Sequence, residues 1–169
     1  MPQLTLIVHN IRSTHNVGAI FRTAEGFGVE SIILTGYTPY PLLEKDSRLP
    51  HIAEKLTQQI HKTALGAETM VPFRYEESVE TAIAAVKQLG YTLVGLEQDA
   101  RSTMLPNYTT PERVALLLGE EVEGITPELR AMCDDLIEIP MVGQKESFNV
   151  SVANGIALYQ LLGRGTTSA

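Results

Sequence analysis

The chain has 169 residues, of which 20 are acidic and 13 basic, giving a net charge of −7. This length suits one folded unit with a sizeable core, and the acidic balance argues against a broadly basic nucleic-acid-binding surface. The single Cys133 excludes an intramolecular disulfide. No apolar run approaches the roughly 18 residues that a membrane span needs, and the N-terminal stretch lacks the basic region of a signal peptide. We therefore expect a cytoplasmic protein without a membrane segment.

Short apolar runs rich in β-branched residues alternate with segments of helical periodicity. The predicted strands, in chain order, are residues 4–10, 31–36, 69–76, 91–97, 113–119 and 135–141. The predicted helices are residues 14–28, 51–65, 78–90, 126–133 and 150–162. This alternation predicts an α/β fold with a mostly parallel open sheet and helices on both faces. Ligands bind beyond the carboxyl ends of the strands in such sheets, so we expect the site in the loops 95–101, 118–124 and 139–149.

The predicted helix 14–28 carries two glycines around an arginine. On a helical wheel Gly18, Arg22 and Gly26 share one face, and the apolar residues occupy the opposite face. Because each glycine costs a helix about 1 kcal/mol relative to alanine, we expect something to pack or bind closely at this face. The alternative is a solvent-facing Arg22 that pairs with Glu25.

The strand 113–119 ends in a glycine that two glutamates follow. Gly119 would let a ligand approach the backbone, and the carboxylates of Glu120 and Glu121 directly follow it in the sequence. The alternative is a solvated acidic turn.

A polar cluster marks the start of the predicted C-terminal helix, in which nine of thirteen residues are apolar. The cluster contains Ser147, Asn149, Ser151 and Asn154. Ser147 or Asn149 could cap the helix, which explains one polar residue but not Asn154 and Gly155 inside it.

Familiar cofactor and metal motifs are absent from the sequence, including GxGxxG, GxxxxGK[ST], CxxC and HExxH. The four histidines form no clustered ligand set, so we expect no metal site. Any chemistry must then come from the three polar segments.

Together these segments resemble the SpoU-type, or TrmH-like, RNA ribose methyltransferases of the SPOUT superfamily. The family motif N-x-G-x-x-x-R is matched by Asn16, Gly18 and Arg22, and G-x-E-x-x-G is matched by Gly119, Glu121 and Gly124. The third motif, I-P-M followed by S-[LF]-N-V-S-x-A, is matched by Ile139, Pro140, Met141, Ser147, Phe148, Asn149, Val150, Ser151 and Ala153. The three motifs occur in the family's order and cover the chain nearly end to end.

The resemblance implies a deep trefoil knot in the C-terminal part, a homodimer, and transfer of a methyl group from S-adenosylmethionine to a ribose 2′-oxygen. It assigns the catalytic site to Arg22, Asn16, Glu121, Ser147 and Asn149. It assigns cofactor binding to Leu96, Gly119, Ile139, Met141, Phe148 and Asn149. Family proposals make the arginine a general base. A guanidinium with a pKa above about 12 rarely gives up its proton, so Arg22 could equally hold a phosphate and stabilise the developing oxyanion, with Glu121 orienting it or binding a substrate hydroxyl.

We expect one methyltransferase domain over residues 1–169, with no separate RNA-binding domain and no basic C-terminal tail, since the end of the chain adds only Arg164. RNA would then be held by the dimer surface, with Arg12, Lys45, Arg48 and Lys55 as candidates. Transfer RNA is the first expected substrate and ribosomal RNA the second. Two alternatives stay open: a catalytically inactive S-adenosylmethionine- or RNA-binding module of the same fold, and a small flavodoxin-like nucleotide or flavin module.

Overall fold

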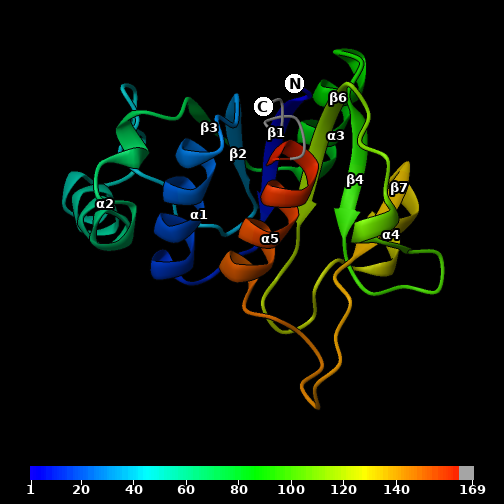
Figure 1. Ribbon diagram of the computed structural model, residues 1–169. Helices are drawn as coiled ribbons and strands as arrows, with labels where there is room; N and C mark the ends of the chain where they lie inside the picture. The colour runs from blue at the N-terminus through cyan, green and yellow to red at the C-terminus, as the bar shows by residue number, and fades with distance from the viewer. Residues whose placement is uncertain (164–169) are drawn as a thin grey trace, which may run out of the picture.

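A computed structural model of the protein describes residues 1–163, so Arg164 and the expected lack of a basic tail lie outside the described residues. The centre is a seven-stranded sheet in the order β3-β2-β1-β6-β4-β7-β5 (Figure 1). The strands are β1 Gln3–His9, β2 Ser31–Thr35, β3 Phe73–Glu76, β4 Thr92–Leu96, β5 Thr103–Met104, β6 Arg113–Leu118 and β7 Asp135–Glu138. Every pairing between neighbouring strands of this sheet is parallel.

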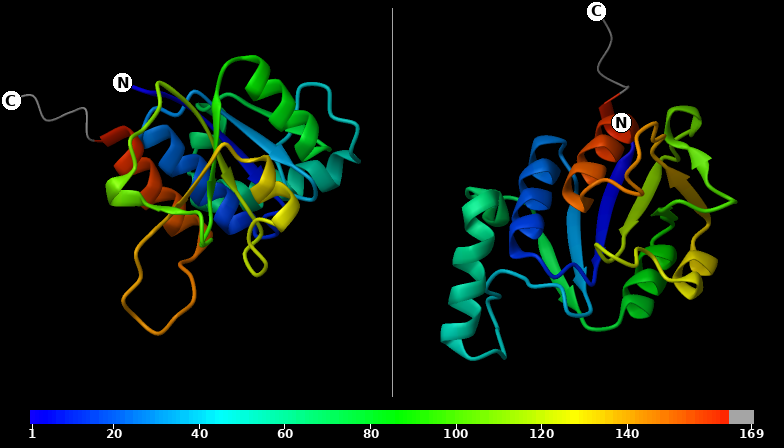
Figure 2. Two further views of the ribbon diagram at one scale, coloured as in Figure 1. Left: turned by 90° about the vertical axis from the view of Figure 1, so that its right-hand side faces the viewer. Right: turned by 90° about the horizontal axis from the view of Figure 1, so that it is seen from below.

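Helices cover both faces of the sheet (Figure 2). They are α1 Thr14–Gly26, α2 Pro50–Ala64, α3 Val79–Gln88, α4 Pro127–Met132 and α5 Val150–Leu162, with the 3₁₀ turns η1 Ala67–Thr69 and η2 Leu105–Asn107. Two separate hydrophobic clusters define the layers: α1, α2 and α5 pack on one face, and α3 and α4 pack on the other. The predicted α/β fold is therefore confirmed.

The central strands are buried on both sides, as expected for a parallel sheet with helices on both faces. In β1 the residues from Leu4 to Val8 are all buried, and in β6 those from Val114 to Leu118 are. Successive side chains point to opposite faces, so Leu6 enters the cluster under α1 and α5, and Ile7 enters the cluster under α3. Burial of each such aliphatic side chain contributes about 1.5–3 kcal/mol.

Two predicted boundaries differ from the structure for physical reasons. Helix α1 ends at Gly26 because Gly28 has φ of 68° and its amide donates to the Glu25 carbonyl, which closes the helix. Strand β3 begins at Phe73, not at residue 69, because residues 67–69 form the turn η1 and Pro72 has no amide hydrogen to donate. The two-residue strand β5 was not predicted, since so short a segment shows no periodicity.

The three loops expected to hold the site meet at one edge of the sheet, because all strands run in the same direction. After β7 the chain swings away from the sheet through residues 139–149 and returns in α5, which packs beside α1 (Figure 1, orange to red). The connection from β4 to β6 passes outside β7 at β5 and reaches α5 at η2. A trefoil knot would entwine these segments; the knot itself stays a prediction.

Across residues 1–163, no helix combines the length and the apolar character that crossing a membrane requires. The same part of the chain contains no group of His, Cys, Asp and Glu side chains placed to hold a metal ion.

Candidate active site

The carboxylate of Glu121 joins the loop after β6 to the start of α1. Its Oε2 accepts a hydrogen bond from the backbone amide of Arg12 at 3.3 Å, and its Oε1 accepts one from the amide of Ser13 at 3.2 Å. The Nδ2 of Asn16 donates to the same Oε1 at 3.4 Å. The acidic turn is therefore not merely solvated, since Glu121 fixes the loop from which α1 begins.

Asn149 brings the third motif to the same place. Its Oδ1 caps α5 by accepting from the amide of Ser151 at 2.9 Å and from the hydroxyl of Ser151 at 2.6 Å. Its Nδ2 donates to the Oδ1 of Asn16 at 3.2 Å. The side chain thus serves as a helix cap and as a contact with α1. One continuous hydrogen-bonded chain, Asn149–Asn16–Glu121, links all three sequence motifs.

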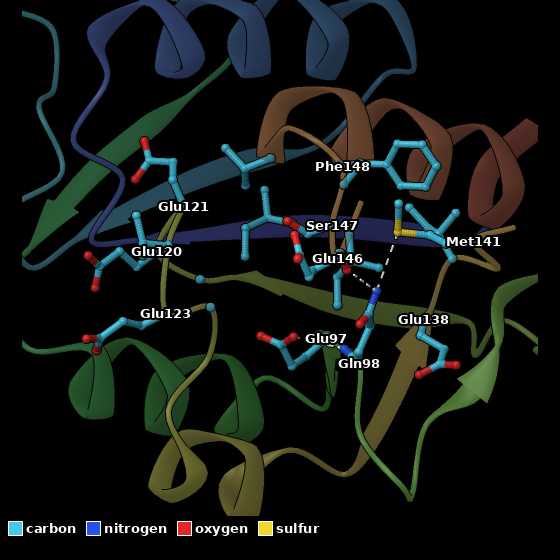
Figure 3. A pocket seen from close by; sticks show the side chains of 18 residues that line it. Glu97, Gln98, Glu120, Glu121, Glu123, Glu138, Met141, Glu146, Ser147 and Phe148 are labelled. Atoms are coloured by element: carbon cyan, nitrogen blue, oxygen red, sulfur yellow. Dashed lines mark hydrogen bonds between the residues drawn. The ribbon is translucent and has the colours of Figure 1, made fainter. Parts of the chain in front are cut away.

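Beside the hydrogen-bonded residues Asn149, Asn16 and Glu121 lies a cavity of about 270 Å³ at the carboxyl ends of β4, β6 and β7 (Figure 3). It is strongly acidic. Six carboxylates line it and, among the described residues, no lysine or arginine does: Glu97, Glu120, Glu121, Glu123, Glu138 and Glu146. Its apolar lining is Leu96, Leu118, Val122, Ile139, Met141, Phe148, Val150 and Ala153. Such a cavity suits a ligand that carries both a cationic group and an apolar ring.

Most of the predicted site residues surround this cavity. Those in the lining are Leu96, Gly119, Glu121, Ile139, Met141, Ser147 and Phe148. Asn149 is not in the lining but lies between two lining residues in sequence and contacts Asn16. The structure thus brings together segments that are more than a hundred residues apart.

Residues 3–159 match the sequence model of the SpoU rRNA methylase family. The chain belongs to this family. It is 35% identical over 159 residues to the 23S rRNA (guanosine-2′-O-)-methyltransferase RlmB of Nitrosomonas europaea, which covers 94% of this chain and 55% of that protein. It is 33% identical over 160 residues to RlmB of Coxiella burnetii, with 95% of this chain and 58% of that protein covered. The chain therefore spans a little over half the length of these curated relatives.

Solved structures of the same fold include proteins that are much longer than this chain and others that are closer to it in length. An AdoMet-bound rRNA methyltransferase from Sinorhizobium meliloti has a TM-score of 0.81 at 25% identity, covering 98% of this chain and 57% of that chain. The TrmH/SpoU tRNA modifying enzyme of A. aeolicus has a TM-score of 0.76 at 26% identity, covering 97% of this chain and 76% of that chain.

The glycines of the second SpoU motif are needed because the loop after β6 folds closely back on the end of that strand and on the loop after β4. A Cβ at Gly119 would lie 2.5 Å from the carbonyl carbon of Gly124, and one at Gly124 would overlap the carboxylate of Glu97. Gly124 also has φ of 68°, which favours glycine. The backbone of Gly124, rather than a ligand alone, therefore approaches Gly119.

Several polar residues of the cavity were missed among the predicted site residues, and two of them tie the loops of the site together. Gln98 donates from Nε2 to the carbonyl of Glu146 at 2.7 Å and so ties the loop after β4 to the loop before α5 (Figure 3). Glu97 accepts from the amide of Ile125 at 2.7 Å, which fixes the loop after β6. Both residues directly follow β4, so the position of the strand end was the available signal.

Arg22 lies apart from the cavity within one chain. It is exposed on α1, beyond Asn16, and is not part of the lining. Within residues 1–163 neither a pair with Glu25 nor a contact with Glu121 forms, so Glu121 does not orient Arg22 in the single chain.

The prediction of close packing at the glycine face of α1 is correct for Gly18. A Cβ there would overlap the hydroxyl of Thr63 and the carbonyl of Ile60, because α2 crosses α1 at this point. At Gly26 nothing lies within 4 Å of the position of a Cβ. Gly18 is therefore explained by helix packing.

Proposed function

We propose that this chain is a methyltransferase domain that uses S-adenosylmethionine to methylate a ribose 2′-hydroxyl in RNA. The observation that carries the proposal is the hydrogen-bonded chain Asn149–Asn16–Glu121 beside an acidic, partly apolar cavity. Membership of the SpoU family and the activities for which the relatives are named support it.

The cavity fits the proposed cofactor. S-adenosylmethionine carries a sulfonium and an ammonium group, and the carboxylate lining offers these cations favourable interactions. The adenine ring would lie against Leu96, Ile139 and Phe148, with the backbone near Gly119 available for hydrogen bonds. A relative of the same fold was solved with AdoMet bound. When bound, the cofactor supplies an electrophilic methyl group.

The residues of this chain would position the acceptor ribose. Two backbone amides hold the carboxylate of Glu121 in place, so it is prepared to accept a hydrogen bond from a substrate hydroxyl. The amide of Asn16 is fixed at both ends, by Glu121 and by Asn149, and can align the sugar beside the cavity. Ser147 lines the cavity on the side of the α5 loop.

Arg22 would act in the cavity of a second copy of the chain. Helix α5 exposes an apolar stripe at spacings of four and three residues, formed by Val152 (51% exposed), Ile156 (36%) and Tyr159 (66%). This stripe runs along α5, which packs beside α1 and its exposed Arg22. A homodimer that covers the stripe removes apolar surface from water and brings Arg22 to the partner, where it holds a phosphate and stabilises the oxyanion.

The proposal also names the class of RNA that is methylated. The curated relatives described above are named for guanosine in 23S rRNA, and the A. aeolicus structure is named for tRNA. We therefore place ribosomal RNA first and transfer RNA second, and expect the enzyme to act in the cytoplasm, where both are found. Ribose-methylation mapping of total RNA, with and without this gene, identifies the substrate by the position that disappears.

Replacing Arg22 tests the function directly. Arg22→Ala should abolish methyl incorporation from labelled S-adenosylmethionine into bulk RNA while cofactor binding measured by calorimetry is preserved, because the arginine would contact the RNA phosphate and the reacting oxygen rather than the residues that line the cofactor cavity. Arg74→Ala, which removes an arginine from the edge strand β3, is the matched control. Turnover by Arg22→Ala at the wild-type rate would contradict the assignment, and cofactor binding without methyl transfer by the wild type would favour the inactive module.

Mixed dimers test whether Arg22 acts across subunits. In a co-expressed mixture of Arg22→Ala and Glu121→Ala chains, half of the dimers would be mixed and each would hold one intact composite site, so about a quarter of wild-type activity should return. If Arg22 acts in its own chain, no mixed dimer has an intact site and no activity returns.

A further inference from the structure

A second groove, distinct from the cofactor cavity, opens next to the start of α1. It has a volume of about 550 Å³ and is lined by the loops after β1 and β2 together with α2. Two arginines and three tyrosines line it, and among the described residues no carboxylate does: Arg12, Tyr37, Tyr40, Arg48 and Tyr75. In a protein of net charge −7 whose cofactor cavity is acidic, this groove is the adjacent surface that would attract a phosphate.

Ring stacking and hydrogen bonds hold the floor of the groove together. Tyr40 and Tyr75 stack with ring centroids 4.2 Å apart, and the guanidinium of Arg48 lies 3.6 Å from the Tyr40 ring centroid. Arg48 also donates to both carboxylate oxygens of Asp46 and to the carbonyl of Tyr40. Because its donors are used inside the protein and Asp46 neutralises its charge, Arg48 positions the floor. These bonds favour a role for Arg48 in shaping the groove, and the expectation that it grips RNA directly stays a prediction.

The rim of the groove carries the side chains that remain available. Arg12 has 75% of its side chain exposed and lies 5.4 Å from the centroid of the Tyr37 ring. Its ion pair with Glu120 is long, with 3.8 Å between its guanidinium and the Oε1 of Glu120, and an exposed pair of this kind contributes little, so a phosphate can compete for the arginine.

Tyr37 is 49% exposed. Its backbone is held in place, since its amide donates to the Oδ1 of Asn10 at 3.1 Å, and the carbonyl oxygen of the preceding Gly36 accepts a hydrogen bond from the hydroxyl of Tyr75 at 2.7 Å. An exposed aromatic ring beside a guanidinium, on a fixed backbone, suits a stacked base and its phosphate.

The groove is continuous with the proposed catalytic residues. The backbone amides of Arg12 and Ser13, which both line the groove, donate to Glu121. Glu121 in turn lines the cofactor cavity. An RNA strand whose target ribose lies at Asn16 and Glu121 would therefore place the next nucleotide in this groove.

We propose that this groove binds the single-stranded nucleotide that flanks the methylated ribose, with its base stacked on Tyr37 and its phosphate paired with Arg12. The inference rests on the proposed RNA methyltransferase function. It makes Tyr37 and Arg12 residues that bind the substrate, whereas Arg48, Tyr40 and Tyr75 keep the groove in shape.

The test uses binding of a fluorescein-labelled, mixed-sequence single-stranded RNA decamer, measured by anisotropy over a range of salt concentrations. Tyr37→Ala should weaken binding about 5- to 150-fold, and Tyr37→Phe should restore it, since stacking needs the ring and not the hydroxyl. Arg12→Ala should weaken binding and reduce the slope of log Kd against log salt by about 0.7, the value for one phosphate of a single strand. Arg74→Ala, an equal change of charge outside the groove, should leave both quantities near the wild-type values.

Calorimetry with S-adenosylmethionine and methyl incorporation into bulk RNA separate the two proposals. The KM for RNA should rise in Tyr37→Ala and Arg12→Ala while cofactor affinity stays unchanged. If the wild type methylates RNA and both variants bind the decamer as tightly as the wild type, the inference about the groove is overturned and the function stands. If the wild type binds the decamer through Tyr37 but methylates no RNA, the proposed function fails and the groove remains an RNA site.

Discussion

Replacing Gly18 by alanine should destabilise the fold, whereas the same replacement at Gly26 in the same helix should not. The added Cβ at position 18 would overlap the Thr63 hydroxyl and the Ile60 carbonyl and lie 2.9 Å from the amide nitrogen of Ala64. The Thr63 side chain can rotate away, but the two backbone groups of α2 cannot move without shifting the helix. Overpacking of this kind costs about 1–3 kcal/mol.

The control replacement has the opposite sign. At Gly26 nothing lies within 4 Å of the new Cβ and φ is not positive, so alanine only restricts the unfolded chain and stabilises by about 0.4–1 kcal/mol. For a chain of this size 1 kcal/mol corresponds to about 2–4 °C in Tm. Gly18→Ala should therefore lower Tm by about 2–12 °C, and Gly26→Ala should raise it slightly.

Thermal unfolding followed by circular dichroism, with urea unfolding to check that the m-value is unchanged, measures both effects. If the Gly18→Ala variant is as stable as Gly26→Ala, then α1 and α2 are farther apart at this point than they are in the structure. The explanation of this motif glycine by helix packing would then be wrong.

Two further predictions concern the cap of α5 and the ion pair between Arg48 and Asp46. Asn149→Ser should keep the cap of α5 but lose the amide donor to Asn16, so methyl incorporation should fall while the urea midpoint stays unchanged. Asn149→Ala should lower methyl incorporation and also lose about 1 kcal/mol of stability, because it removes the cap. Wild-type activity in the Ser variant would contradict a positioning role for Asn149. Hydrogen bonds from Arg48 hold the pKa of Asp46 well below its ordinary value of 3.8, so the stability that this pair contributes is present above that value and is lost as the pH falls below it. The difference in urea midpoint between wild type and Asp46→Asn should therefore shrink between pH 5 and about pH 2, and a constant difference would count against the pairing.

Local patterns determined the fold class and most element positions. The short apolar runs of β1 and β6 predicted strands, and the helical spacing of Val17, Ile20 and Phe21 predicted the apolar face of α1 that the structure buries. These predictions succeed because burial imposes a period that a short stretch of sequence already displays. Segments without a period, such as β5, η1 and the start of β3, could not be placed in this way.

The candidate site was predicted in part. Motif resemblance and the rule on strand ends identified Leu96, Gly119, Ile139 and Phe148, which all line the cavity. The sequence did not indicate which groups hold Glu121 within the single chain, because two of its partners are backbone amides that follow β1 and have no sequence signature.

The sequence by itself determined a parallel α/β sheet, the order of its elements and the loops in which polar groups gather, because hydrophobic periodicity and strand ends are local properties of the chain. Only the tertiary structure decided that Asn149 contacts Asn16, that α2 rather than a ligand requires Gly18, and that an arginine–tyrosine groove without carboxylates adjoins an acidic cavity. The physical reason is that hydrogen bonds and steric contacts act over a few ångströms in space, and residues far apart in the chain meet at those distances only after the sheet has formed.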